Sequence, residues 1–274
     1  MNTRGSFKTK LVSSPYLLWA ALFVIAPLFF VIYYSFTDPS GAFTFENVME
    51  LSKYSTTFLR SIWFGIVATL ICLVLAYPIA YIISQKSENA QRTMVMLIML
   101  PMWMNFLIRT YSWMALLQDT GIINSLLTKI GLSPVHMINT SGAVILGMVY
   151  NFLPYMILPI YSVMAKLDHS LVEAAQDLGG NRLVVIQKCI LPMSLPGVVS
   201  GITMVFVPSV STFYISQKLG GGSFDLIGDV IERQFQQAYN YNLGAALSLV
   251  LMALILLSMA FLNRFTNDEE GMVI

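Results

Sequence analysis

Residues Asp168 to Lys188 read D-H-S-L-V-E-A-A-Q-D-L-G-G-N-R-L-V-V-I-Q-K, a polar stretch between two segments too apolar to leave a membrane. Ser170 and Glu173 have the spacing of a capping box, in which the two side chains satisfy amides at a helix start. An apolar stripe at three- and four-residue spacing follows on the predicted helix, formed by Leu171, Ala174, Ala175 and Leu178. Its small alanines allow another surface to approach closely.

A glycine pair predicts the end of this helix. Gly179 and Gly180 follow Leu178, and glycine adopts left-handed backbone angles without a side-chain clash, so the chain can reverse there. Asn181 is placed to cap a second helix over Arg182 to Ile190. Pro192 suits the first turn of the membrane helix that comes next.

The spacing of this segment resembles the cytoplasmic EAA loop in the membrane permease subunits of ABC importers. In that family, glutamate and two alanines precede a glycine by three residues, and nine residues later come isoleucine, any residue, leucine and proline. The matching residues are Glu173, Ala174, Ala175, Gly179, Leu191 and Pro192. Cys189 replaces the usual isoleucine with another apolar residue. The tripeptide alone would favour an ordinary amphipathic loop helix, whereas the full spacing favours the family.

The composition is that of an all-α integral membrane protein. The 274 residues are 57% hydrophobic and 11% charged, whereas soluble domains carry about 25% charged residues. The net charge of +1 offers no basic surface for nucleic acid. We therefore expect a membrane protein that contacts lipid and does not bind nucleic acid.

Apolar segments long enough to cross a bilayer predict six transmembrane helices. A spanning helix needs about 20 apolar residues, and isolated strands would leave backbone groups unpaired in lipid. The segments are approximately Tyr16–Phe36, Ser61–Ser84, Thr93–Leu117, Gly142–Met164, Leu191–Phe213 and Leu243–Leu262. The first is too long for the apolar core of a cleaved secretory signal and is expected to remain as a span.

The positive charges predict the orientation. One side of the predicted spans carries nine lysines and arginines: Arg4, Lys8, Lys10, Lys86, Arg92, Lys166, Arg182, Lys188 and Arg264. The other side carries five: Lys53, Arg60, Lys129, Lys218 and Arg233. Because cytoplasmic loops are enriched in positive charge, both termini and the Glu173 loop are expected in the cytoplasm.

Polar residues inside two spans are candidates for the translocation pathway. In the third span, Pro101, Asn105, Arg109 and Trp113 recur every fourth residue and are expected on one face. The fourth span repeats this spacing with Gly147, Asn151, Tyr155 and Pro159. Arg109 either faces the pathway or a partner, or snorkels to the outer headgroups. Helix packing is the alternative role for Asn151 and Tyr155.

The predicted outer side has its own organisation. Asp38–Leu59 and Gln118–Ser141 can carry short interfacial helices, and the glycines at 220–222 predict a turn. Phe224–Phe235 predicts an amphipathic helix with Asp225, Asp229 and Glu232 on one face, where they can attract cations at an outer mouth. Small residues that allow close helix packing occur at Gly197 and Gly201, and at Gly244 and Ser248.

Catalytic chemistry is not expected in this chain. Its only histidines, His136 and His169, lie in loops, and no P-loop spacing, metal-ligand cluster or nucleophile with a partner base is present in the sequence. The sequence predicts no catalytic residue, no metal and no cofactor bound by the chain itself.

Over nearly its whole length the chain resembles the first membrane subunit of the spermidine/putrescine importers, the PotB-like permeases. The resemblance lies in L-P-M-W with Arg109, Tyr111 and Trp113, and in F-Y-I-S through G-G-G to L-I-G-D-V-I-E-R-Q-F. It implies a MetI-like bundle and a single permease domain over 1–274, with a five-helix core over 61–262 and a coupling loop over 165–190.

The resemblance also implies the setting. The partners would be a homologous second permease subunit, an ATPase dimer that binds ATP and Mg, and an external substrate-binding protein, all at a bacterial cytoplasmic (inner) membrane. In the loop, Ser170, Glu173, Ala174, Ala175, Leu178, Gly179 and Gly180 would couple to the ATPase. The alternatives are the same role for another small solute, an ion-coupled secondary transporter, and a purely structural membrane subunit.

Overall fold

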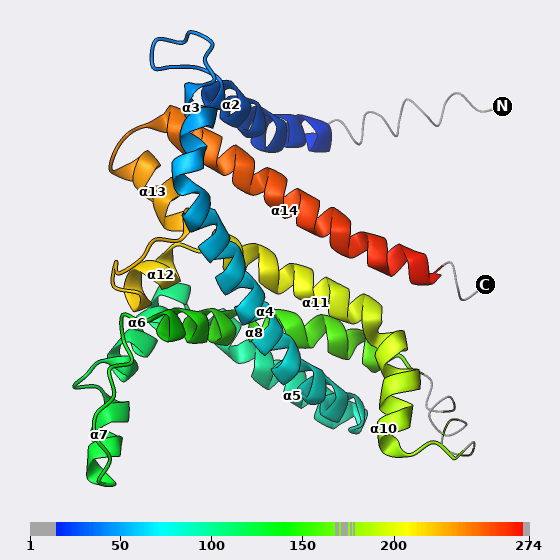
Figure 1. The fold of residues 1–274 in the computed structure, drawn as a ribbon. Coiled ribbons are helices and arrows are strands. Elements are labelled where there is room, and N and C mark those ends of the chain that lie inside the picture. Colours follow the sequence, from blue (N-terminus) through cyan, green and yellow to red (C-terminus); the bar gives the residue numbers. More distant parts are fainter. Residues whose placement is uncertain (1–14, 168–169, 171–174, 176, 178, 271–274) are drawn as a thin grey trace, which may run out of the picture. The chain divides into compact units, whose positions relative to one another are not determined.

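The structure is a computed structural model that describes residues 15–167, 170, 175, 177 and 179–270 (Figure 1). These residues are mostly helical. In chain order the helices are η1 (Ala21–Ile25), α2 (Ala26–Ser35), α3 (Glu46–Glu50), η2 (Leu51–Tyr54), α4 (Ser55–Ser84), α5 (Glu88–Trp103), α6 (Phe106–Leu117), α7 (Ile122–Lys129), α8 (Ser141–Met164), α10 (Arg182–Val185), η3 (Ile186–Ile190), α11 (Leu191–Ser211), α12 (Tyr214–Leu219), α13 (Ile227–Gln236) and α14 (Tyr241–Glu270).

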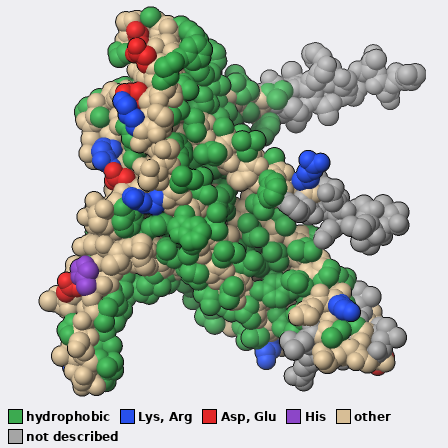
Figure 2. Space-filling model, viewed as in Figure 1, with side chains coloured by type: hydrophobic (Ala, Val, Ile, Leu, Met, Phe, Trp, Pro, Cys, Tyr) green, Lys and Arg blue, Asp and Glu red, His purple; other side chains and the backbone are tan. Residues whose placement is uncertain are grey.

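Five of the six predicted spans are continuous helices of membrane-spanning length and composition. They cover Pro15–Ser35, Glu46–Ser84, Ser141–Met164, Ile186–Ser211 and Tyr241–Leu262. Hydrophobic side chains cover most of the face shown in Figure 2, as expected for helices in contact with lipid. The predicted interfacial helices are α3 and α7, and the amphipathic helix expected after the glycine turn is α13.

The third predicted span is not one straight helix. The chain bends by 87° between α5 and the helical stretch that begins at Phe106. Met104 is extended, with φ −75° and ψ 145°, and the Asn105 side chain caps α6 by accepting a hydrogen bond from the Leu107 amide at 2.8 Å. The prediction that Pro101, Asn105, Arg109 and Trp113 share one face was therefore wrong, because a capping asparagine restarts the helix in another direction.

The predicted boundary between a loop helix ending at Ile190 and a separate membrane helix was also wrong. The helical chain continues from Arg182 to Ser211 through the π-helical turn η3. Pro192 lies in the first turn of α11, as expected. A proline removes one amide donor and crowds the carbonyl four residues earlier, and the wider π-helical turn accommodates both effects without ending the helix.

Close packing of α8 against α11 depends on glycine, as predicted. A Cβ atom at Gly197 would lie 2.8 Å from the Pro159 carbonyl oxygen and 3.1 Å from the Ile160 Cα atom. At Gly201 it would lie 2.7 Å from the Met156 Sδ atom. Small residues at such positions let helix backbones approach, and here they bury the centre of the α8–α11 pair.

The chain divides into two compact units, each described by itself. One contains residues 1–55 and 230–254, and the other contains 56–229 and 255–274. In the first unit, Gly244 of α14 lies against the Phe235 ring of α13, where a Cβ atom would be 3.1 Å from the ring. The second unit contains α5, α6, α8, α11 and α12 and most of the buried hydrophobic core. The predicted core over 61–262 contains residues of both units.

A matched pair of glycine substitutions tests the α8–α11 contact. We expect Gly197→Ala to lower the free energy of unfolding by about 1–3 kcal/mol, because the methyl group overpacks against backbone atoms. Gly142→Ala is the control, because the nearest atom to its Cβ would be Thr140 Oγ1 at 3.7 Å. It should be neutral or slightly stabilising. Thermal unfolding of the purified chain in detergent gives both values, and equal stability of the two variants would contradict the assignment.

Candidate functional site: the loop elbow, the buried polar residues and an outer pocket

The elbow of the predicted coupling loop has the backbone geometry that its sequence predicts. Gly179 has φ +83°, a left-handed conformation, and the Gly180 amide donates to the Ala175 carbonyl at 3.1 Å. This bond across the glycine is the pattern of a Schellman helix end. Asn181 caps the next helix, since its Oδ1 atom accepts from the Val184 amide at 2.9 Å. The chain therefore turns sharply at Gly179.

The described residues of this loop have an inner and an outer side. Ala175 is partly buried and packs against the hydrophobic core, whereas Ser170 and Asp177 are exposed. Both exposed residues are polar, whereas Ala175 is apolar. Three predicted coupling residues, Glu173, Ala174 and Leu178, lie outside the described residues. The coupling role of the loop stays a prediction at this point.

Arg109 is mostly buried in α6, and its predicted roles, facing the pathway or a partner or snorkelling to the headgroups, stay predictions. Its residue is 7% exposed, and its guanidinium carbon lies 6.0 Å from the centre of the Phe106 ring. Its Nε and Nη1 atoms are buried and have no hydrogen-bond acceptor among the described residues. A buried charge without a partner is costly. Two of the three nitrogens of the Arg109 guanidinium are thus unsatisfied within the described chain.

The other pathway candidates are not gathered on one surface. Asn151 is 1% exposed, and its Nδ2 atom donates to the Gly147 carbonyl at 2.8 Å while Oδ1 has no partner among the described residues. Trp113 is partly buried and makes an edge contact with Tyr150 at 5.3 Å, whereas Asn105 and Tyr155 are exposed. A shared pathway role for these residues remains a prediction.

The three acidic residues predicted at the outer mouth lie in different environments. Asp229 is 4% exposed, and its carboxylate oxygens accept from Ser216 Oγ at 2.9 Å and from the Leu226 amide at 2.8 Å. These bonds hold the start of α13, so the visible contacts of Asp229 are structural. Asp225 and Glu232 are partly exposed. Attraction of cations by these two residues stays a prediction.

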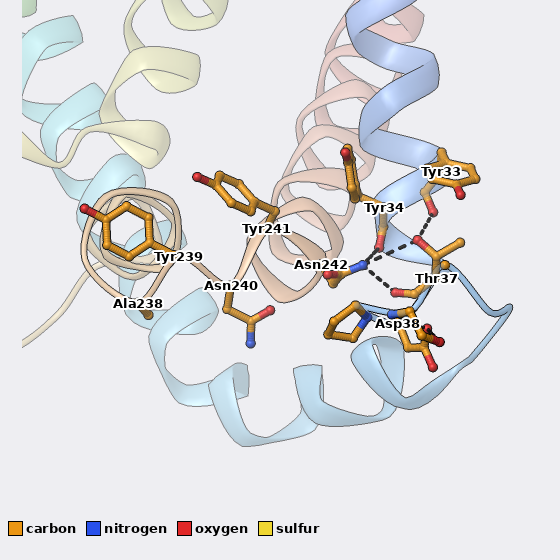
Figure 3. A pocket seen from close by; sticks show the side chains of 12 residues that line it. Tyr33, Tyr34, Thr37, Asp38, Ala238, Tyr239, Asn240, Tyr241 and Asn242 are labelled. Atoms are coloured by element: carbon orange, nitrogen blue, oxygen red, sulfur yellow. Dashed lines mark hydrogen bonds between the residues drawn. The ribbon is translucent and has the colours of Figure 1, made fainter.

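An open pocket that the sequence did not reveal lies in the first unit, between the end of α2 and the start of α14 (Figure 3). Its volume is about 610 Å³. The lining combines aromatic, amide and acidic side chains from two segments: Tyr33, Tyr34, Thr37, Asp38, Pro39, Ser40 and Gly41, and Ala238, Tyr239, Asn240, Tyr241 and Asn242. The signal in the sequence was the pair of tyrosine-rich stretches at the two span ends, but their separation of about 200 residues concealed their proximity.

Hydrogen bonds fix the floor of this pocket. The Asn242 side chain donates from Nδ2 to the Thr37 carbonyl at 2.6 Å and to the Tyr34 carbonyl at 3.2 Å. Tyr34 lies in the last turn of α2, where helix geometry leaves carbonyls without partners further along the helix, and Thr37 follows the helix end. Asn242 and Thr37 are both buried. The described residues contain no group of three or more histidine, cysteine or acidic side chains that could hold a metal.

A substitution that removes the Arg109 guanidinium tests whether its buried N–H groups lack hydrogen-bond acceptors. We expect Arg109→Met to raise the free energy of unfolding of the chain purified alone by about 1–3 kcal/mol, because it removes desolvated N–H groups that lack acceptors. The control is Arg60→Met, whose guanidinium lies 5.7 Å from the Phe224 ring centre and should lose about 0.5–1 kcal/mol of cation–π attraction. Thermal unfolding measures both. A destabilised Arg109→Met chain would show that Arg109 is already satisfied.

Proteins with similar sequences are named as transport permeases. Spermidine/putrescine transport system permease protein PotB of Haemophilus influenzae is 36% identical over 264 residues, which covers 92% of this chain and 92% of that protein. The protein of the same name from Escherichia coli K12 is also 36% identical, over 92% of this chain and 96% of its own length. The inner membrane ABC transporter permease protein YdcU of Escherichia coli K12 is 28% identical over 75% of this chain and 70% of its length.

Solved structures share the fold. A bacterial ABC transporter involved in the import of the acidic polysaccharide alginate matches with a TM-score of 0.77 and 18% identity, over 96% of this chain and 98% of that chain. The complex of the alginate transporter with a periplasmic protein bound to an alginate pentasaccharide gives the same score at 17% identity, over 97% of each chain. The family model described as "Binding-protein-dependent transport system inner membrane component" matches residues 76–267. The chain therefore belongs to this family, the permease subunits of ABC importers.

Proposed function

We propose that this chain is the permease subunit of a polyamine importer and forms half of the translocation pathway for spermidine and putrescine. The observation that carries the substrate is the 36% identity to the spermidine/putrescine permeases over 92% of the chain. The alginate importer structures are less than 20% identical and support the fold only. Polyamines are cations at neutral pH, so their pathway needs carboxylates, carbonyls or aromatic faces.

In this proposal the loop around Gly179 is the mechanical link to a separate ATPase dimer, which binds the ATP and Mg. Closure of the ATPase dimer moves the helix that begins near Ser170, and the spans then change from inward-open to outward-open. The exposed Ser170 and Asp177 support an outward docking face, while packed Ala175 connects that helix to the core. Coupling of this kind requires different contacts in the two states.

The remaining partners follow the same scheme. A homologous second permease subunit completes the pathway, an external substrate-binding protein delivers the polyamine, and lipid surrounds the spans. Both termini lie in the cytoplasm, which the distribution of lysine and arginine favours. With this proposed orientation, the Gly179 elbow would lie on the ATPase side, and the end of α2 and the start of α14 would lie on the outer side.

A permease for another small solute is the second candidate, and the 28% identity to YdcU favours it as the fallback. An ion-coupled secondary transporter is disfavoured by the family, although the 87° break after α5 is a feature that such transporters also use. A helix break is not sufficient for ion coupling, which normally also needs membrane-embedded carboxylates and a paired structural repeat.

The substrate is tested by uptake into membrane vesicles that contain the full complex and internal ATP. We expect saturable uptake of radiolabelled spermidine and putrescine that stops when ATP is withheld. Competition by unlabelled polyamines, but not by sugars or amino acids, would establish the substrate class. Uptake of a different solute with no competition by spermidine would replace the substrate while leaving the permease role intact. Copurification of an ATPase separates this role from a structural subunit.

Two substitutions at one glycine test the coupling. We expect Gly179→Val to reduce both spermidine uptake and uptake-linked ATP hydrolysis by about fivefold or more, because a β-branched residue is strained at φ +83°. Gly179→Asn is the matched control, since asparagine tolerates this conformation and no atom of the described residues lies within 4 Å of the added Cβ. Full activity of the valine variant in the purified complex would show that the elbow is not the coupling element.

A further inference from the structure

The outer pocket of the first unit contains the carboxylate of Asp38, and only one of its two oxygens accepts hydrogen bonds from the described residues. Asp38 Oδ1 accepts three hydrogen bonds, from the Ser40 amide at 2.8 Å, Ser40 Oγ at 2.6 Å and the Ala42 amide at 2.9 Å. Oδ2 accepts no bond from any described residue, and the ion pairs of the described chain do not include Asp38. The Ser40 hydroxyl and the Ala42 amide lower the pKa of Asp38, so its charge persists at neutral pH.

Four tyrosine side chains line the same pocket as this carboxylate. Tyr33 and Tyr34 come from the end of α2, Tyr239 from the turn before α14, and Tyr241 from the first position of α14 (Figure 3). Each of the four is between 42% and 69% exposed. Exposed rings with hydroxyl groups offer π faces and oxygen atoms to a cation.

One of these tyrosines is held in an unfavourable backbone conformation. Tyr239 has φ +52°, which few residues other than glycine adopt. Hydrogen bonds from the Ala238 and Asn240 amides to the Arg233 and Gln234 carbonyls enforce this turn at 2.9 Å each. Strain of this kind is often found at functional sites. It presents the most exposed ring of the pocket at the rim.

We propose that this pocket, built around Asp38 and the tyrosines at 33, 34, 239 and 241, is a binding site for organic ammonium ions of the polyamine class. The identification of the ligand as the transported solute rests on the proposed function. The volume of about 610 Å³ lies within the range of small-molecule sites and accommodates an extended diamine or triamine.

The lining favours this ligand over other ions. Asp38 would repel an anion, and the described residues that line the pocket include no lysine or arginine to attract one. A calcium ion normally takes six to eight oxygen ligands including several carboxylates, whereas the lining offers one carboxylate. An organic ammonium ion needs one charge partner and benefits from ring faces, which match the four tyrosines.

Spermidine binding to the purified full complex without ATP tests the site. We expect Asp38→Asn to raise the dissociation constant about three- to tenfold at low ionic strength, with a smaller effect at high salt, because it removes one exposed charge. Asparagine keeps an Oδ1 acceptor for Ser40 and Ala42, so the turn should persist. The control is Asp119→Asn, an exposed acid that pairs with His136 at 2.9 Å and does not line the pocket. It should leave binding within about twofold.

A second variant separates the contribution of the Tyr239 ring to binding from any effect on the stability of the fold. Tyr239→Gly removes the exposed ring and relieves the positive φ, so we expect weaker spermidine binding with unchanged or higher thermal stability. Sodium and putrescine serve as the inorganic and organic probes, and only putrescine should compete at low concentration. Native affinity in both Asp38→Asn and Tyr239→Gly would overturn the site.

The two proposals fail in distinguishable ways. If vesicles take up spermidine with ATP but both pocket variants bind it normally, the pocket assignment is wrong and the transport function stands. If vesicles do not take up spermidine while Asp38→Asn still weakens its binding to the complex, the site is an ammonium site and the transported solute is another. Loss of spermidine binding in Asp119→Asn as well would point to a general charge effect and would overturn the pocket.

Discussion

Two helix ends in the described chain follow one constraint, that backbone polar groups in or near a membrane need partners within the protein. At the break after α5, the Asn105 side chain satisfies the Leu107 amide at the start of α6. Where α2 ends, Asn242 satisfies the carbonyls of Tyr34 and Thr37. Because these partners are side chains from defined positions, the same bonds that complete the backbone also fix direction changes and the floor of the outer pocket.

Local signals in the sequence predicted much of the fold, and contacts between distant residues were beyond their reach. Gly179, Asn181 and the α8–α11 glycines act within a few residues or through simple size, so their roles were predictable. Hydropathy gives the length of a span but not its direction, which is why the 87° break was missed although Asn105 is a strong helix cap. The pairing of Asn242 with Thr37 joins residues at opposite ends of the chain, and no periodic pattern reports it.

Two buried polar groups show that the described chain does not complete its own interior. Arg109 has N–H groups without acceptors, and Asn151 Oδ1 has no donor. In folded proteins such groups are rare because desolvation without a hydrogen bond is unfavourable. A permease that works as half of a two-subunit pathway can leave these groups for a partner to satisfy. Since Arg109 is positive, a carboxylate suits it, and a polyamine does not.

A pathway for cations would be expected to contain acidic residues, and the predicted spans contain few. The strength of binding that transport requires makes this less of a difficulty. A transport site has to attract its solute and then release it, so a single exposed carboxylate with aromatic neighbours is better suited than a deep cage of acids. Asp38 provides one persistent charge, and water screens its attraction. Aromatic faces add attraction for alkyl ammonium groups without adding charge, and so distinguish polyamines from sodium. If the proposed pocket binds the transported solute, weak and selective recognition there would not require acidic residues within the spans.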